Sequence, residues 1–112
     1  MRYLFEEYAF DTDRRELHRG TDVVSVAPQA FDLLDYLIRN RERVVSKDDL
    51  INAIWNGRSV SDAAVTTRLN VARSVLGDTG EEQRLIKTCP RKGFRFVGKV
   101  VEGQEPVSAT AD

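Results

Sequence analysis

The chain has 112 residues, of which 41% are hydrophobic and 31% charged, and this balance fits one soluble globular domain with a single core. No apolar run approaches the ~20 residues that cross a bilayer, and the first residues carry no signal-peptide pattern, so we expect a cytoplasmic protein. Cys89 and His18 stand alone in their residue types, which excludes an internal disulfide and a Cys/His zinc site; we expect no metal and no cofactor.

The net charge of −1 hides an uneven distribution of charge along the chain. From Arg39 to Arg95 there are twelve Arg and Lys but seven Asp and Glu, so this segment carries +5 and the remainder −6. A basic middle between acidic ends indicates a face that meets nucleic acid.

Short strands are predicted ahead of the first helix. Residues 3–10 are rich in aromatic side chains, which favour strands, and their alternation breaks at Glu6-Glu7, where we expect a bulge or a bend. Residues 14–19 and 23–26 follow as two further strands between turn-forming residues. Three short strands at this spacing predict an antiparallel meander.

Two helices follow in the chain. Pro28 suits a first helical turn, and apolar residues at helical spacing extend this helix to about Arg39. Ser46 with Asp49 three residues later is a variant of the capping box and begins a second helix, from Lys47 to about Trp55.

A third helix is predicted over residues 61–77. Ser61 can cap its first turn, and Gly77 can adopt the left-handed conformation that ends a helix. One narrow apolar stripe runs along it and consists of Val65, Leu69, Ala72 and Leu76.

The other face of this helix is small, polar and basic. At about 100° per residue, Thr67 and Val71 lie opposite the stripe, with Arg68 and Asn70 on its two sides. A helix that enters a DNA groove needs short side chains and no carboxylates, and no acidic residue lies between positions 63 and 76. A surface helix that merely lacks acids would have the same pattern.

A β-hairpin is predicted after the third helix, with strands at residues 85–89 and 94–97. Its tip carries the adjacent cations Arg91 and Lys92. Cys89 has no second thiol beside it to resolve an oxidised sulfur, so we expect it to be structural. Residues 100–112 offer little to bury and predict a linker or a frayed tail.

The order of these elements, together with several short motifs, resembles the OmpR/PhoB-type winged-helix DNA-binding domain. The motifs are Phe10-Asp11, Pro28-Gln29-Ala30-Phe31-Asp32-Leu33-Leu34, Val44-Val45-Ser46-Lys47-Asp48-Asp49-Leu50, Ile54-Trp55, Leu76-Gly77-Asp78 and Arg91-Lys92-Gly93-Phe94-Arg95-Phe96-Val97. The resemblance implies an α+β fold, a winged helix-turn-helix with an N-terminal antiparallel sheet, three helices and a C-terminal β-hairpin wing. It implies a DNA-binding domain over residues 1–99, followed by a flexible tail or linker over residues 100–112.

The resemblance also implies where DNA would lie. In this family the third helix enters the major groove, and the wing reaches the adjacent minor groove or the backbone. Carried over residue by residue, the resemblance implies that five residues of the third helix lie at or beside the DNA: Thr67, Arg68, Asn70, Val71 and Arg73. It implies that four further residues contact phosphates or the minor groove: Trp55, Thr88, Arg91 and Lys92. Because Arg73 lies nearer the apolar stripe, an ion pair inside the domain remains an open alternative for it.

Two departures from the family pattern affect these expectations. Asn70 and Val71 stand where basic residues are common, so base reading should be modest. Nothing resembles a phosphoacceptor receiver domain ahead of the wing domain. The chain therefore resembles the subgroup that has this domain at its N-terminus, and it could be a fragment of a longer regulator.

The function expected is sequence-specific binding of double-stranded DNA by a bacterial-type transcription regulator, without catalysis. The alternative is a winged-helix module for protein interaction, in which the third helix or the loop at residues 56–60 contacts RNA polymerase or an adaptor. We expect a monomer in isolation, with dimers on tandem DNA sites. An enzyme has little support, because paired carboxylates such as Glu81-Glu82 lie at predicted turns or helix starts.

Overall fold

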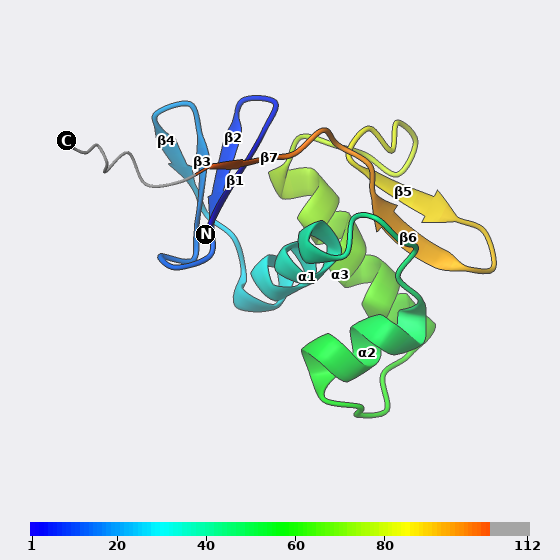
Figure 1. The fold of residues 1–112 in the computed structure, drawn as a ribbon. Coiled ribbons are helices and arrows are strands. Elements are labelled where there is room, and N and C mark those ends of the chain that lie inside the picture. The colour runs from blue at the N-terminus through cyan, green and yellow to red at the C-terminus, as the bar shows by residue number, and fades with distance from the viewer. Residues whose placement is uncertain (104–112) are drawn as a thin grey trace. The chain divides into compact units, whose positions relative to one another are not determined.

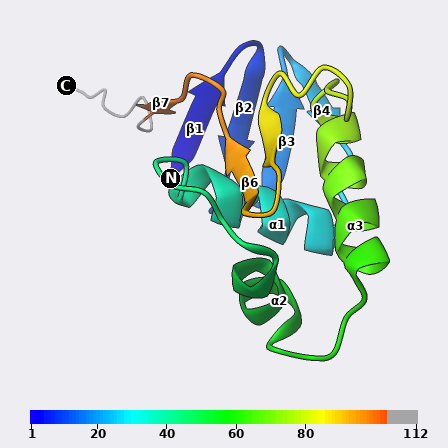
Figure 2. The same cartoon turned by 90° about the vertical axis from the view of Figure 1, so that its right-hand side faces the viewer.

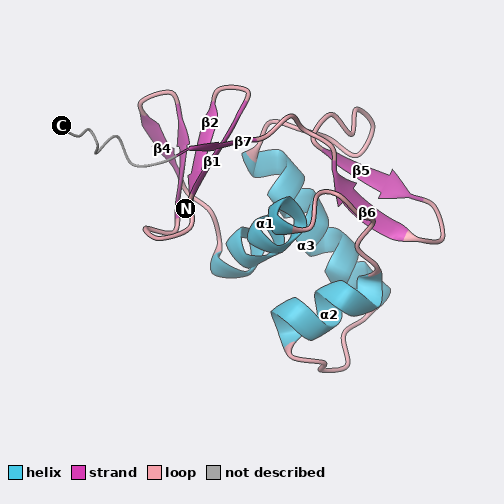
Figure 3. Cartoon of the chain, in the orientation of Figure 1, coloured by secondary structure: helices cyan, strands magenta, loops and turns pink. Residues whose placement is uncertain are grey.

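The computed structural model describes residues 1–103 and consists of two compact units (Figure 1). Met1–Ser25 and the chain from Lys99 onward form the first unit, and Val26–Gly98 form the second. In Figure 3 the strands of both units are magenta, and the helices, all of which belong to the second unit, are cyan. No helix in the described part of the chain is long and apolar enough to cross a membrane.

The first unit is an antiparallel sheet with the strand order β4-β3-β2-β1-β7. Its strands are β1 (Arg2–Phe5), β2 (Tyr8–Asp11), β3 (Glu16–Arg19), β4 (Asp22–Val24) and β7 (Val101–Gly103). Tyr3 pairs with Phe10, and Phe10 pairs with Leu17, so that apolar side chains fall on one buried face.

The prediction of one strand over residues 3–10 was wrong, because Glu6 and Glu7 form a two-residue turn between β1 and β2. Glu6 has a left-handed φ of 53°, and Phe5 pairs directly with Tyr8 across the turn. Residues that flank a two-residue turn point to the same face, so the aromatic pattern changes phase where the chain reverses. The meander therefore has four strands before α1.

The predicted tail also differs from the structure at its start. Val101–Gly103 forms β7, which pairs with β1 through Leu4 and Val101. The remainder of that prediction, residues 104–112, lies outside the described residues.

The second unit contains α1 (Pro28–Arg39), α2 (Lys47–Trp55), α3 (Asp62–Val75), β5 (Ile86–Cys89) and β6 (Gly93–Phe96). Helix α1 packs against α2, α3 and β6, and α2 also packs against α3 (Figure 2). The buried hydrophobic residues of this unit are Ala30, Phe31, Leu33, Leu34, Leu37, Ile38, Val45, Leu50, Val65, Leu69, Ala72, Leu76, Leu85, Ile86, Phe94 and Phe96. All four residues of the predicted α3 stripe are among them, which confirms the phase of that helix.

The helix ends follow the predicted chemistry. Ser46 Oγ accepts from Asp49 N at 3.0 Å, and Asp49 Oδ2 accepts from Ser46 N at 3.2 Å, so both halves of the capping box are present. Ser61 Oγ accepts from Ala64 N at 3.1 Å at the start of α3. Gly77 follows the end of α3 with a left-handed φ of 67°.

A backbone bridge joins the hairpin to the residue before the α2 cap. Val45 N donates to Phe94 O at 2.7 Å, and Phe94 N donates to Val45 O at 2.8 Å. Gly93 next to this bridge has a φ of 141°, and a Cβ atom there would lie 2.0 Å from Val45 O. Glycine is required at this position by the close approach of two backbones as well as by its φ.

Asp78 joins the end of α3 to β5 with one buried carboxylate. Its Oδ1 accepts from Thr79 N and Arg84 N at 2.9 and 2.7 Å, and its Oδ2 accepts from Leu85 N and Ile86 N at 2.9 and 3.1 Å. Burial works to raise the pKa of Asp78, but the backbone N–H donors outweigh it and hold the pKa below its ordinary value.

We expect Gly93→Ala to destabilise the protein strongly. Backbone strain of about 1–3 kcal/mol and overpacking of about 1–3 kcal/mol should together lower the free energy of unfolding by more than about 2 kcal/mol. Urea unfolding measures the loss. Gly57→Ala is the control, since Gly57 also has a left-handed φ of 77° but a Cβ there would meet only Asn52 Oδ1 at 3.4 Å. An equal loss in both variants would contradict the steric argument.

We expect the Asp78 carboxylate to make stability depend on acid pH. Since its pKa is lower in the folded chain, the stabilisation is complete above the unfolded-state pKa of about 4 and is lost as pH falls through the folded-state pKa. Asp78→Asn should cost roughly 1–3 kcal/mol at pH 7, because its NH₂ group faces N–H donors, and should flatten the acid dependence.

Urea unfolding at pH 7 and at several acid pH values tests this expectation. Asp48→Asn removes the same charge from an exposed position in α2 and serves as the control. Similar losses in the two variants, with unchanged acid dependence, would show that the buried carboxylate does not stabilise the fold.

Candidate nucleic-acid interface

Helix α3 presents a solvent-facing side of short polar residues. Thr66, Thr67, Asn70 and Ser74 are exposed, while Arg68 and Val71 are partly exposed. Arg68 has no hydrogen-bond or ion-pair partner within the described residues, and its buried Nε atom is unpaired there. This side therefore offers donors, acceptors and one uncommitted guanidinium without a carboxylate.

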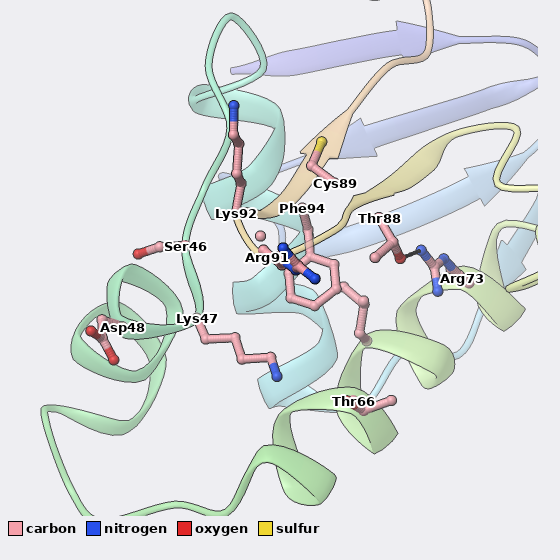
Figure 4. A pocket seen from close by; sticks show the side chains of 12 residues that line it. Ser46, Lys47, Asp48, Thr66, Arg73, Thr88, Cys89, Arg91, Lys92 and Phe94 are labelled. Atoms are coloured by element: carbon pink, nitrogen blue, oxygen red, sulfur yellow. Dashed lines mark hydrogen bonds between the residues drawn. The ribbon is translucent and has the colours of Figure 1, made fainter.

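A pocket of about 440 Å³ lies between the start of α2, the middle of α3 and the hairpin (Figure 4). It is lined by Ser46, Lys47, Asp48, Thr66, Leu69, Arg73, Thr88, Cys89, Arg91, Lys92, Gly93 and Phe94. Leu69 and Phe94 are buried, and the polar lining comes from three different elements. The pocket is therefore built by the fold of the second unit and not by one segment.

Positive charge predominates around this pocket. Lys47, Arg91 and Lys92 contribute side-chain cations from two sides, and Asp48 is the one acid of its lining. The tip of the hairpin is held in shape by the bond from Lys92 N to Cys89 O at 2.9 Å and by the left-handed φ of 67° at Arg91. The start of α2 adds the positive end of a helix dipole. Such a surface attracts anions.

Arg73 is the one predicted site residue of α3 that is buried in the fold. Its side chain is only 4% exposed and forms hydrogen bonds to acceptors of the hairpin strand β5. Burial lowers the pKa of Arg73, and the negative charge of Asp78 partly offsets this. The open alternative was an ion pair with a carboxylate, but the hydrogen-bond partners of Arg73 among the described residues are neutral: Ile86 O, Thr88 Oγ1 and, at 3.5 Å, Asn70 Oδ1.

The structure brings most of the other predicted residues to one side of the second unit. Thr88, Arg91 and Lys92 line the pocket, and Thr67, Arg68, Asn70 and Val71 lie on the neighbouring α3. Trp55 is an exception. It is partly buried at the last residue of α2, the end opposite to the one that lines the pocket.

Sequence reasoning missed Lys47 and Thr66 as lining residues. Lys47 is the first residue of α2, where a cation opposes the helix dipole, and it lies 3.4 Å from Asp62 Oδ2 of α3. An unfavourable cation at a predicted helix start is a signal in the sequence for an anionic partner. Thr66 had no such signal, because its role depends on where the hairpin packs.

A family model and curated relatives that are similar to this chain both describe transcriptional regulators. The family model described as "Transcriptional regulatory protein, C terminal" matches residues 20–96, well over half of the chain. The transcriptional regulator HilA of Salmonella typhi is 26% identical over 105 residues, which cover 94% of this chain and 19% of HilA. The chain thus spans about a fifth of the length of this curated relative.

Solved structures match the fold. The DNA-binding domain of Klebsiella pneumoniae RstA, solved in complex with the RstA box, superposes with a TM-score of 0.76 at 25% identity, covering 85% of this chain and 95% of that one. DrrB of Thermotoga maritima, described as an OmpR/PhoB homologue, gives a TM-score of 0.78 at 25% identity, covering 87% of this chain and 44% of that one. The chain therefore belongs to the family of transcriptional regulatory protein C-terminal domains, with the winged-helix fold of the OmpR/PhoB type.

Proposed function

We propose that the chain is the DNA-binding domain of a transcription regulator and recognises double-stranded DNA without catalysis. The observation that carries this proposal is the exposed, acid-free side of α3 next to a pocket surrounded by Lys47, Arg91 and Lys92. The similarity to RstA, whose domain was solved with a DNA site, supports the same function.

In the proposed complex, α3 lies in the major groove. Asn70 can pair with two atoms of an adenine edge, Arg68 can bond guanine or a phosphate, and Val71 can contact a thymine methyl group. Thr67 is short enough to permit close approach. These four residues would therefore supply the sequence preference.

The pocket is the proposed seat of the DNA backbone between the two grooves. A phosphate there would meet Lys47 and the start of α2 on one side and the hairpin tip on the other. Thr88 Oγ1 accepts a hydrogen bond from Arg73. The hydroxyl hydrogen of Thr88 is not used in that bond and can be donated to a phosphate. Arg91 and Lys92 would extend the contact toward the minor groove.

The wider organisation is part of the same proposal. Residues 1–103 would act as one DNA-binding domain, since β7 at residues 101–103 belongs to the sheet of the first unit. We infer a monomer in isolation that pairs on tandem sites, where linkage raises avidity, and a cytoplasmic location where DNA is accessible. Trp55 would contact a phosphate. The loop at residues 56–60 would contact RNA polymerase.

We expect helix and hairpin variants to fail in different ways. Arg91→Ala/Lys92→Ala should weaken binding to all duplexes alike and lower the slope of log affinity against log salt by up to about 2. Asn70→Ala should cost about 1–3 kcal/mol on a selected site and little on scrambled DNA. Fluorescence titrations at several salt concentrations, with a selected and a scrambled duplex, measure both effects.

The control is Arg14→Ala/Lys99→Ala, which removes two exposed cations from the first unit and should leave the affinity nearly unchanged. Loss of specificity in the hairpin variant, with a uniform loss in Asn70→Ala, would reverse the assignment. Absence of salt-dependent binding by the unmodified chain would favour the protein-interaction module.

We expect Lys47→Ala to behave as the loss of one phosphate contact. It should lower the salt slope by about 1 and weaken binding to selected and scrambled duplexes by the same factor. Lys99→Ala is the control with an equal change of charge. If Lys47→Ala binds like the control variant, the backbone does not pass through the pocket.

A further inference from the structure

We propose that Arg73 is a positioning residue for DNA recognition: it holds Asn70 and the hairpin in their working arrangement and does not touch DNA. The proposal rests on the DNA-binding function proposed above. It assigns to a buried arginine of α3 a role that differs from those of the exposed residues around it.

The guanidinium of Arg73 ties α3 to strand β5. Its Nε and Nη2 atoms donate to Ile86 O at 3.1 and 2.9 Å, and Nη2 also donates to Thr88 Oγ1 at 2.8 Å, the bond drawn in Figure 4. Thr88 is fixed further by its own N–H, which donates to Gln83 Oε1 at 2.9 Å. A helix proposed to read bases and a strand of the wing are thus joined through one planar side chain.

The third nitrogen of the same guanidinium reaches the exposed side of α3. Arg73 Nη1 lies 3.5 Å from Asn70 Oδ1, a long hydrogen bond from the buried cation to the proposed adenine reader. This bond occupies one lone pair of the Asn70 amide oxygen, and the second lone pair and the NH₂ group stay available to an adenine edge. The orientation of a reading side chain is therefore set from inside the domain.

Stability alone is a poor reason for this arrangement. The acceptors of Arg73 are a carbonyl, a hydroxyl and an amide, all neutral, so the charge is buried without a paired carboxylate. Buried charges are costly, and apolar side chains of similar volume often stabilise a fold as well or better. An apolar residue cannot supply the several N–H donors of one planar guanidinium, which here bond Ile86 O, Thr88 Oγ1 and Asn70 Oδ1 at the same time.

The test compares Arg73→Lys with the unmodified chain on selected and scrambled duplexes. Lysine keeps the positive charge but replaces the planar guanidinium, with donors on three nitrogens, by a single ammonium group. We expect binding to the selected site to weaken roughly tenfold or more, binding to scrambled DNA to weaken less than about threefold, and the salt slope to stay unchanged. We also expect Asn70→Ala to cost much less in the Arg73→Lys background, since the two residues act together.

A neighbouring control is Gly80→Ala, because a Cβ there would lie at ordinary distances of 3.7 Å from Arg73 Nη1 and 3.9 Å from Asn70 Oδ1. It should leave binding unchanged. If Arg73→Lys does not fold, Thr88→Val and Thr88→Ser replace it: the valine variant removes the Nη2 acceptor and should lose selectivity, and the serine variant should retain it.

Two outcomes would overturn the proposal while leaving the DNA-binding function intact. For Arg73→Met, which removes the charge, a salt slope lower by about 1 on both duplexes would mean that Arg73 contacts a phosphate. A lower melting temperature with unchanged affinities of the folded protein would mean a purely structural role. If the unmodified chain binds no duplex, the proposed function itself fails, which the same titration reveals first.

Discussion

The second unit depends on the pair of backbone hydrogen bonds between Val45 and Phe94. These bonds fix the hairpin against the residue that precedes the cap of α2, so the pocket acquires two of its three walls from one contact. They also impose Gly93, because any Cβ atom there would collide with Val45 O. The bridge positions the residues proposed to contact phosphates near the pocket. The burial of the α3 stripe orients the residues proposed to contact bases in the major groove.

Much of this arrangement could be predicted from local chemistry. Ser46, Ser61 and Gly77 act at the helix ends through side-chain oxygens or a left-handed φ, and such effects depend on a few neighbouring residues. The apolar stripe of α3 likewise follows from helical spacing, so its exposed side could be named in advance. The site residues named on that side stay predictions.

The predictions that were wrong concern segments where one sequence pattern fits two local structures, or where a contact with a distant part of the chain determines the structure. A change of phase among aromatic residues fits a bulge or a two-residue turn, and the left-handed φ at Glu6 selects the turn. For Arg73 the sequence left open a contact with DNA and an ion pair inside the domain, and the neutral acceptors that β5 supplies could not be read from helical spacing. Strand β7 depended on its pairing with β1 far along the chain, which spacing alone does not reveal.

The bridge between Val45 and Phe94 has a consequence for the order of folding. It closes a loop of about fifty residues, and the entropy lost on closing a loop grows with its length. The three helices can form and pack with contacts closer in sequence, so the hairpin should dock late, after the helical part is in place. On a ribosome, the pocket would then be completed only when the segment around Phe94 has emerged, and a chain cut short before it would have a recognition helix but no anchor beside it.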